Sequence, residues 1–443
     1  MKKTKIIVTL GPAVEDREIL SRIFRNGADI ARFNLSHGSF GWHKRMKGMI
    51  NGIEAEIGRI IPTIADLKGP EMRTTNKKSV DIETGKEYDL AEDIGITNEM
   101  LWKDVRKGDV IFIADGEIRL MVGKAGPGSM TVRAMGSGSI GPRRKVSVPG
   151  RKISLPAISE DDRKDIDFMA NAGFDMVAQS FVRGADDVKR LKEHLNGIGH
   201  RKRIIAKFEH PNAVANSKAI LDAADGIMIA RGDLGIEMAY EKLPGIQKRL
   251  IAEARFKSKP VIVATHMMKS MTENMFPTRA EVADVANAIH QGTDAVMLSE
   301  ETTIGRFPLE SVKAMDRIIR RSESEAIVEP VEPVDNKDVV AMEAFNMACR
   351  FNCPIIAPTD GGSTPRKISR YRPRMRTYAI TSTREVAAYV NLCYGVAPIM
   401  CNERYDPVFD KLDGIRRMAK TGKAVFVFGH PTGNGRTNSI VYT

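Results

Sequence analysis

Cysteines and long apolar runs are scarce in this sequence of 443 residues. The four cysteines all lie after residue 348 and form no CxxC pair, which argues against a zinc site and a disulfide framework. No apolar run approaches the length of a membrane-spanning helix. Acidic residues follow the N-terminal MKKTKIIVTL without a small-residue cleavage site, so we predict a first strand rather than a signal peptide. These absences predict a cytoplasmic protein without a membrane partner.

Aromatic residues are also few, at 6%, although the chain is basic, with a formal net charge of +12. A basic chain can bind nucleic acid or small phosphorylated ligands. Lys and Arg are spread over the whole length, and the densest basic run covers only residues 364–378. We therefore expect small phosphorylated ligands and no nucleic acid; the alternative is salt-sensitive nucleic-acid binding through one contiguous basic face.

Eight short β-type segments recur along the chain, and a helix-length segment follows each of them. They are TKIIVTL, DIARFNLS and PTIADLK in residues 1–70, then FDMVAQSFV, RIIAKFEH, GIMIARGDLG, KPVIVATHMM and TDAVMLSEET in residues 149–325. Eight such units predict a (β/α)8 TIM barrel, an α/β fold whose catalytic groups lie at the C-terminal ends of the strands.

Two further regions interrupt or follow the predicted barrel. Residues 71–148 are turn-rich, alternate apolar with polar residues and contain few helical patterns, which predicts an inserted small all-β domain. Residues 322–338 form an acidic, proline-containing seam typical of a linker. Strand and helix patterns alternate again in residues 339–443, so we predict a C-terminal open α/β domain there.

Polar side chains follow most of the predicted barrel strands. Each one alone could be a solvated rim residue or a helix cap. Their repetition at the same end of many parallel strands indicates a shared site instead, because those ends converge on one opening of a barrel. The residues are Arg32, Asn34, Ser36, Asp66, Lys207, Glu209, Arg231, Asp233, Thr265, Ser299 and Glu301.

The residue types predict phosphoryl-transfer chemistry. Glu209 and Asp233 follow neighbouring strands and supply the carboxylate oxygens that Mg²⁺ prefers. Several cations suit an anionic, phosphorylated substrate. They are Arg32, Arg73, Lys207 and Arg231. No Cys or His nucleophile is evident, so we expect catalysis by charge stabilisation.

Several segments, in the right order, resemble the signature segments of the pyruvate kinase family. They are ARFNLSHG, DLKGPEMRT, AKFEH, DGIMIARGDLGIE, ATHMM, PTRAEVADVANAI, LSEET and YRPR. The resemblance spans nearly the whole chain and is looser in the last third. It implies a barrel with an inserted β-barrel lid, a C-terminal regulatory domain and a homotetramer. The implied reaction is phosphoenolpyruvate plus ADP giving pyruvate plus ATP, the last step of glycolysis.

The resemblance also implies roles for residues at matching positions. Glu209 and Asp233 would bind Mg²⁺ or Mn²⁺. Catalytic roles fall to Lys207, Arg32, Arg73, Thr265 and Ser299. Substrate binding falls to Arg32, Lys207, Gly232, Asp233 and Thr265. Nucleotide binding falls to Pro12, Asn34, His37, Trp42 and Arg73. K⁺ would be held by Asn34, Ser36, Asp66 and Leu67.

Some positions depart from the family pattern. Ile304 stands where many members have a lysine, so that lysine is not the proton donor to the enolate here. Water relayed by Thr265 or Ser299 is the remaining candidate. Leu67 more often accompanies a K⁺-independent form, whereas Glu71 goes with a K⁺ requirement, and we predict activation by K⁺.

The segment TDGGSTPRKIS, residues 359–369, resembles the loop that grips an effector's phosphate in regulated family members. Ser363 or Thr364 would cap a helix with Pro365 at its first position, and glycine amides would face the anion. The predicted effector residues are Thr359, Gly361, Gly362, Ser363 and Thr364. An ordinary helix cap is the alternative, and residues 429–438 are a candidate second loop of the site.

A Mg²⁺-dependent carbon–carbon lyase on the same barrel is a competing interpretation. It would also use Glu and Asp as metal ligands and an enolate intermediate. It would need neither the inserted β domain nor the KGPEMRT segment, and a requirement for ADP separates the two activities.

Overall fold

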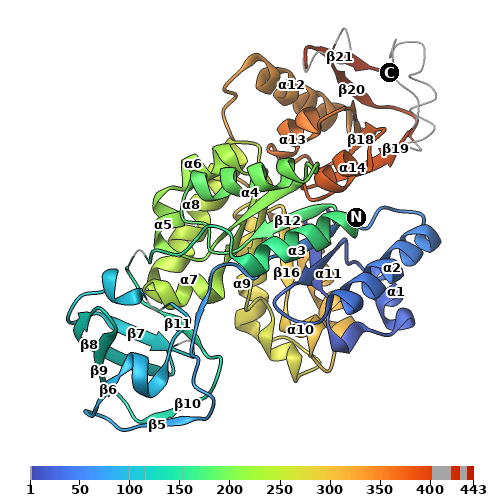
Figure 1. Ribbon diagram of the computed structural model, residues 1–443. Helices are drawn as coiled ribbons and strands as arrows, with labels where there is room; N and C mark the ends of the chain where they lie inside the picture. The colour runs from blue at the N-terminus through green and yellow to red at the C-terminus, as the bar shows by residue number, and fades with distance from the viewer. Residues whose placement is uncertain (1, 99, 115, 152, 402–420, 430–436) are drawn as a thin grey trace.

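The computed structural model of the chain describes residues 2–98, 100–114, 116–151, 153–401, 421–429 and 437–443. A barrel occupies the centre of the molecule, and a smaller β body and an α/β body lie at opposite ends of it (Figure 1). The predicted fold class is confirmed, since eight parallel strands close in the order β1-β16-β15-β14-β13-β12-β3-β2. They are β1 (Lys5–Thr9), β2 (Ile30–Asn34), β3 (Thr63–Asp66), β12 (Met176–Gln179), β13 (Arg203–Phe208), β14 (Gly226–Ala230), β15 (Val261–Ala264) and β16 (Ala295–Leu298).

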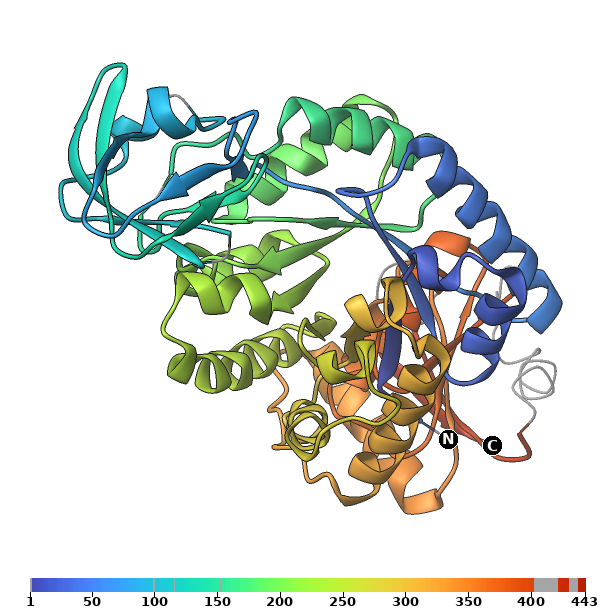
Figure 2. The same cartoon turned by 90° about the horizontal axis from the view of Figure 1, so that it is seen from below.

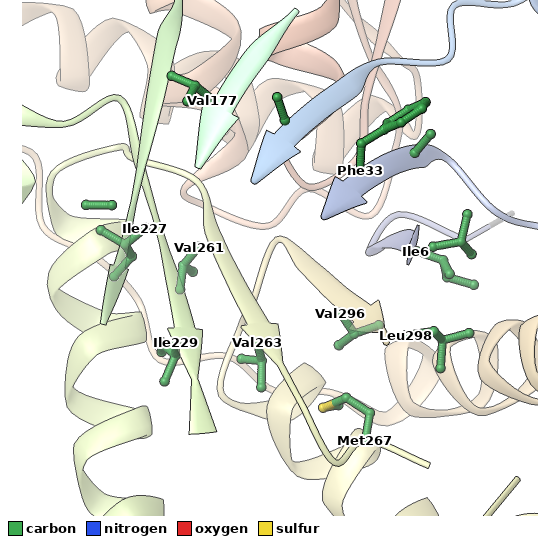
Figure 3. Close-up of a cluster of buried hydrophobic side chains, with 14 of the residues drawn as sticks. Ile6, Phe33, Val177, Ile227, Ile229, Val261, Val263, Met267, Val296 and Leu298 are labelled. Carbon is green, nitrogen blue, oxygen red and sulfur yellow. The ribbon is translucent and has the colours of Figure 1, made fainter. Parts of the chain in front are cut away.

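Both faces of the barrel strands are buried, because neighbouring side chains on a strand point to opposite sides. Ile7, Ile30 and Ile205 belong to the cluster inside the barrel. Ile6 and Phe33 belong to the larger cluster between the strands and the surrounding helices (Figure 3). This double burial explains why the strands read as continuous apolar runs in the sequence.

The helices around the barrel begin with the residue types that satisfy free N–H groups at a helix start. The side chain of Asp16 accepts from Ile19 N, and Ser159 and Thr278 form capping boxes. The helices are α1 (Arg17–Arg25), α2 (Phe40–Ile57), α3 (Glu160–Asn171), α4 (Ala185–Gly197), α5 (Pro211–Ala215), α6 (Ser217–Ala223), α7 (Arg231–Glu237), α8 (Leu243–Phe256), α9 (Arg279–His290), α10 (Glu300–Thr303) and α11 (Pro308–Glu325). No helix in the described part of the chain is long and apolar enough to span a membrane.

The smaller β body, called the lid below, is inserted between β3 and α3 and stands off to one side of the barrel (Figures 1 and 2). A six-stranded sheet in the order β4-β11-β7-β8-β9-β6 and a two-stranded sheet β10-β5 form it. Its strands are β4 (Met72–Arg73), β5 (Val80–Ile82), β6 (Glu87–Asp89), β7 (Val110–Ile113), β8 (Ile118–Gly126), β9 (Ser129–Ala134), β10 (Gly138–Ile140) and β11 (Lys145–Ser147). The lid has a hydrophobic cluster of its own.

The C-terminal body contains a five-stranded sheet in the order β19-β18-β17-β20-β21. Its strands are β17 (Ile355–Pro358), β18 (Thr377–Thr381), β19 (Val396–Met400), β20 (Val425–Phe428) and β21 (Ser439–Tyr442). Its described helices are α12 (Asn336–Phe351), α13 (Ser363–Ser369) and α14 (Arg384–Asn391). Four of the strands follow the predicted pattern; β21, which pairs antiparallel with β20, was not predicted.

The C-terminal body closes the N-terminal end of the barrel. Tyr389 and Leu392, from and just after α14, join the hydrophobic cluster inside the barrel, and the Tyr389 hydroxyl donates to Asp225 O at 2.7 Å. Arg372 forms two hydrogen bonds with Asp294, which directly precedes β16, at 2.9 and 3.0 Å. The floor of the barrel is therefore filled, and the C-terminal strand ends remain as the place for a site.

Candidate active site

Lys207 is the centre of the polar cluster at the C-terminal strand ends. Its ammonium lies 2.9 Å from Glu209 Oε1 and 3.1 Å from Asp66 Oδ1, and it donates to Ser180 Oγ at 2.7 Å. Burial disfavours the charge, but the carboxylates of Asp66 and Glu209 outweigh it and raise the pKa of Lys207. Lys207 is therefore a fixed, permanent cation beneath the opening of the barrel.

Arg32 supplies a second buried cation beside Lys207. Its Nε donates to Asp66 Oδ2 at 2.6 Å, and an Nη donates to Thr9 Oγ1 at 3.0 Å. Asp66 is completely buried, yet the cations Arg32 and Lys207 overcome the effect of burial and hold its pKa below the usual range. Asp66 thus orients both cations. Arg32 keeps donors for an anion from the mouth of the barrel, whereas the three donors of Lys207 already face Asp66, Glu209 and Ser180.

Glu209 and Asp233 form a pair of facing carboxyl groups. Burial and the charge of Asp233 raise the pKa of Glu209, even though Lys207 is adjacent and Phe181 N donates to Glu209 Oε2 at 2.7 Å. Asp233 in turn is hydrogen-bonded to Glu209, and its pKa is lowered because nearby lysines outweigh its burial. Two carboxylates that compete for one proton are well suited to share a divalent cation instead.

A lid residue that the sequence analysis missed completes this cluster. Lys145, at the start of β11, forms an ion pair with Asp233 and lies 5.2 Å above the ring of Phe181. Burial opposes its charge, but Asp233 and then Glu209 raise the pKa of Lys145. Nothing in the segment PRRKVS distinguishes Lys145 from its basic neighbours, and only the closure of the lid sheet brings it to the barrel.

Ser180 is a second residue that the sequence analysis missed. Ser180 directly follows β12, and its hydroxyl contacts three of the predicted residues. The hydroxyl accepts from Lys207 Nζ and donates to Leu67 O, both at 2.7 Å, and Asp66 Oδ1 lies 3.3 Å from it. Asn34 lies beside Asp66 in the register of β2 and β3, and Asn34 Oδ1 accepts from Ser36 N at 3.3 Å. The predicted K⁺ ligands are therefore neighbours. A polar residue directly after a strand was the available signal for Ser180.

Thr265 and Gly232 meet on the far side of the cluster. Gly232 N donates to Thr265 Oγ1, and that hydroxyl donates to Ala264 O, both at 2.6 Å. The backbone of Thr265 has φ +67°, a left-handed conformation that is uncommon for a β-branched residue. Ser299 follows β16, and its hydroxyl is buried without a hydrogen-bond partner in the described chain. Both hydroxyls lie directly after barrel strands, Thr265 after β15 and Ser299 after β16.

Other predicted residues are engaged elsewhere. Arg231 forms an ion pair with Asp284 of α9 at 2.7 Å and donates to Thr265 O at 2.8 Å. The predicted role of Arg231 as a substrate-binding cation is therefore wrong. The side chain of Arg231 instead holds the strand ends against α9. Glu301 accepts backbone N–H groups at Met268 and Ser299. Both are structural.

Arg73 lies in the lid rather than in the barrel cluster. Its guanidinium pairs with Glu71 at 2.5 Å and donates to Arg143 O at 2.9 Å. No described contact joins it to Lys207 or Arg32. Arg73 can reach a ligand in the barrel only from the lid side of the opening.

The predicted nucleotide residues lie at the ends of β1 and β2. Pro12 begins a single helical turn, Pro12–Val14, and Glu15 follows this turn directly. The indole N–H of Trp42, in the first turn of α2, donates to the carboxylate of Glu15. His37 O contacts His43 Nε2 at 2.8 Å, and the His43 ring meets Trp42 edge-on. Pro12 and His37 are exposed on this surface.

The predicted helix cap in the C-terminal loop is wrong. Gly362, with φ +79°, is the N-cap of α13, and no side-chain hydrogen bond caps this helix start. Ser363 and Thr364 are the first two residues of the helix, and Pro365 is the third. Thr364 is buried against Thr437 at 2.7 Å, and Thr359 Oγ1 accepts from Gly362 N at 2.9 Å. The helix instead starts at a left-handed glycine, and no described side chain accepts its first N–H groups. Of the candidate second loop, residues 430–436 lie outside the described residues.

Together, the closed barrel and the cluster of paired cations and carboxylates define a (β/α)8-barrel enzyme that acts on an anionic substrate. Comparisons with known proteins agree. A model described as the pyruvate kinase barrel domain matches residues 1–312, and one described as the pyruvate kinase alpha/beta domain matches residues 338–441. The chain belongs to the pyruvate kinase family, whose members are phosphotransferases.

Individual relatives give the same answer. A pyruvate kinase from Sporosarcina psychrophila is 38% identical over 90% of this chain and 72% of its own length. One from Corynebacterium efficiens is 36% identical over 99% of this chain and 97% of its own length. A crystal structure of a pyruvate kinase from Cryptosporidium parvum superposes with a TM-score of 0.91 and 31% identity, covering 100% of this chain and 96% of the other.

The ion pair of Lys145 with Asp233 should hold the lid against the barrel. We expect Lys145→Met to speed amide exchange around β4 and β11 about fivefold, since a partly buried pair contributes about 1 kcal/mol. Hydrogen–deuterium exchange read by mass spectrometry measures this. Lys124→Met, which removes an exposed lid lysine, is the control. Equal exchange in both variants would show that the pair does not hold the lid.

Proposed function

We propose that this member of the pyruvate kinase family transfers the phosphoryl group of phosphoenolpyruvate to ADP at the cluster around Lys207. The observation that carries the proposal is the fixed position of the Lys207 ammonium, 3.1 Å from Asp66 and 2.9 Å from Glu209. A cation held in this way needs no rearrangement to stabilise charge that develops in a transition state. Family membership favours this activity over the carbon–carbon lyase.

The charge balance of the cluster supports an anionic substrate bound together with a metal ion. Three cations face three carboxylates: Arg32, Lys207 and Lys145 face Asp66, Glu209 and Asp233. Glu209 and Asp233 would hold Mg²⁺ or Mn²⁺, which supplies positive charge for the substrate's carboxylate and phosphoryl oxygens when bound. No group of three or more His, Cys, Asp or Glu side chains suited to a metal occurs among the described residues, in keeping with Mg²⁺, which uses few carboxylates and takes water and substrate oxygens.

The roles of the protein groups follow from their positions. Arg32 would bind the phosphate of phosphoenolpyruvate, and Lys207 would stabilise the phosphoryl group during transfer and the enolate left behind. ADP would attack from the surface of Pro12, His37 and Trp42, with Arg73 entering from the lid. A new bond forms between phosphorus and an oxygen of the ADP β-phosphate, while the bond between phosphorus and the enol oxygen of phosphoenolpyruvate breaks. The enolate that remains takes a proton at its terminal carbon and becomes pyruvate. Water relayed by Thr265 or Ser299 would deliver that proton.

Further predictions stay proposals at this stage. Activation by K⁺ is supported by the adjacency of Asn34, Asp66 and Leu67 O around Ser180. An effector site in the loop before α13 is supported by its glycines. The domain limits 1–70, 71–148, 149–325 and 339–443 are supported by the separate sheets. We also propose a homotetramer and a cytoplasmic location, on the ground of family membership.

Lys207→Met is the direct test of the proposed function. We expect kcat for ATP formation from phosphoenolpyruvate and ADP to fall about 1,000-fold or more, because transition-state charge stabilisation is lost. Lys47→Met is the matched control, since Lys47, on α2, is also buried and donates to Asn51 at 2.8 Å. Near-normal turnover in Lys207→Met, with an unchanged circular dichroism spectrum, would refute the assignment. Turnover of a keto acid without ADP would favour the lyase.

Glu209→Gln tests the metal site without relying on turnover. Binding of Mn²⁺ to the substrate-free protein, followed by electron paramagnetic resonance, should weaken on the order of tenfold or more. Glu237→Gln is the control, because Glu237 is a half-buried carboxyl on α7 without a hydrogen bond or ion pair to Glu209 among the described residues. Equal Mn²⁺ affinity in wild type and Glu209→Gln would exclude this residue as a ligand.

K⁺ dependence is tested in buffer free of K⁺ and NH₄⁺. We expect activity to rise several-fold as KCl replaces tetramethylammonium chloride at constant ionic strength, because Glu71 adds an anion near the substrate phosphate that a cation must offset. Full activity without K⁺ would contradict the prediction. It would show that Leu67, rather than Glu71, indicates whether the enzyme requires K⁺.

Gly361→Glu tests the effector loop. Gly361 has no atom within 4 Å of an added Cβ, so the new side chain fits and its carboxylate would repel a bound phosphate. We expect any activation by sugar phosphates or nucleotides to disappear in this variant and to survive in Gly361→Gln. If no phosphorylated metabolite changes the kinetics of the wild type, the loop is an ordinary helix start.

A further inference from the structure

A small cavity lies between the barrel and the C-terminal body, at the end of the barrel opposite to the site. Its volume is about 10 Å³, and its lining is unusually basic. The charged lining residues are Arg255, Lys259, Asp294, Arg366, Arg370 and Arg372. Five cations and one carboxylate thus surround a space about the size of one water molecule.

Two of these cations have carboxylate partners. Arg372 pairs with Asp294 at 2.9 Å, and Arg370 pairs at the same distance with Asp338, which already binds Lys367. Asp294 and Asp338 are thus the carboxylates paired directly with cations of the lining.

The other three cations contact only neutral groups. Arg255 donates to Glu329 O at 2.9 Å and Arg370 O at 3.2 Å, and Lys259 donates to Ala224 O at 2.6 Å. Arg366 donates to Ser258 O at 2.9 Å and lies over the ring of Tyr389. No carboxylate of the described chain lies within ion-pair distance of any of the three, although Glu329 acts on Arg255 and Asp225 acts on Lys259 from farther away.

Two donors of the cavity lining also lack partners. The Nε atoms of Arg255 and Arg370 are buried without a hydrogen-bond partner among the described residues, and the two residues are only 5% and 2% exposed. Burial and the neighbouring Arg372 lower the pKa of Arg255 to about 10, and burial and Arg366 lower the pKa of Lys259 to about 8. Uncompensated buried cations with free donors are costly unless an anion joins them.

We propose that this cavity binds one small inorganic anion, of the size of chloride, between the Nε donors of Arg255 and Arg370. The small volume suits a single small ion. A water molecule would satisfy the donors but would leave the excess positive charge, so the charge balance favours the anion. Arg255 lies in the last turn of α8 of the barrel, and Arg370 directly follows α13, so the anion would join the two bodies.

Thermal unfolding of the full-length protein tests the proposal. With sodium chloride replacing sodium gluconate at constant ionic strength, we expect the wild-type Tm to rise saturably by roughly 1–3 °C, because the anion binds only the folded state. Arg255→Gln should lose this dependence. Lys248→Gln is the matched control, since Lys248 is an exposed lysine of the same helix, paired with Glu329. A wild-type Tm that shows no saturable dependence, or the same dependence in Arg255→Gln, would overturn the site.

A direct observation keeps the test independent of the stability of any variant. Crystals of the wild-type protein grown or soaked in sodium bromide should show an anomalous scattering peak within hydrogen-bond distance of Arg255 Nε and Arg370 Nε. A peak only at surface sites, with a water molecule in the cavity, would reject the anion.

Discussion

The contact of Lys207 with Asp66 and Glu209 is the interaction on which the rest of the active site depends. A lysine this deeply buried is stable only beside carboxylates, and carboxylates this deeply buried are stable only beside cations. Asp66 therefore binds Arg32 as well as Lys207, and Glu209 faces Asp233. Removing any one member would leave an unpaired charge on the others, so the cluster behaves as one electrostatic unit.

The fold supports that unit by making the two ends of the barrel unequal. At the N-terminal end, Tyr389 and Leu392 fill the interior, and Arg372 with Asp294 ties the C-terminal body to the strands. At the other end, the lid contributes Lys145 to the carboxylate pair. Polar side chains can gather inside the barrel only at its C-terminal end, because apolar groups fill the interior at the other end.

Much of the fold and of the site could be predicted from the sequence, because both depend on local patterns. Eight apolar strands predict a parallel barrel, and the polar residues directly after these strands indicate which end of the barrel carries the site. Lys207, Glu209 and Asp233 were identified in this way. Contacts that depend on the relative placement of distant segments could not be predicted. Lys145 arrives from another body, and Arg231 turns toward Asp284 of α9, which strand spacing does not reveal. The start of α13 was misplaced because a left-handed glycine, Gly362, replaced the expected side-chain cap.

The tyrosine beneath the barrel also limits how this architecture can be divided. Tyr389 and Leu392 are parts of the barrel's interior that are encoded more than 90 residues after its last strand, which ends at Leu298. A barrel separated from the C-terminal body would have an open hydrophobic floor at Ile7, Ile30 and Ile64. The barrel and the C-terminal body are therefore expected to be retained together in evolution. A barrel of this kind could lose the C-terminal body only if new apolar side chains first covered the exposed interior at its N-terminal end.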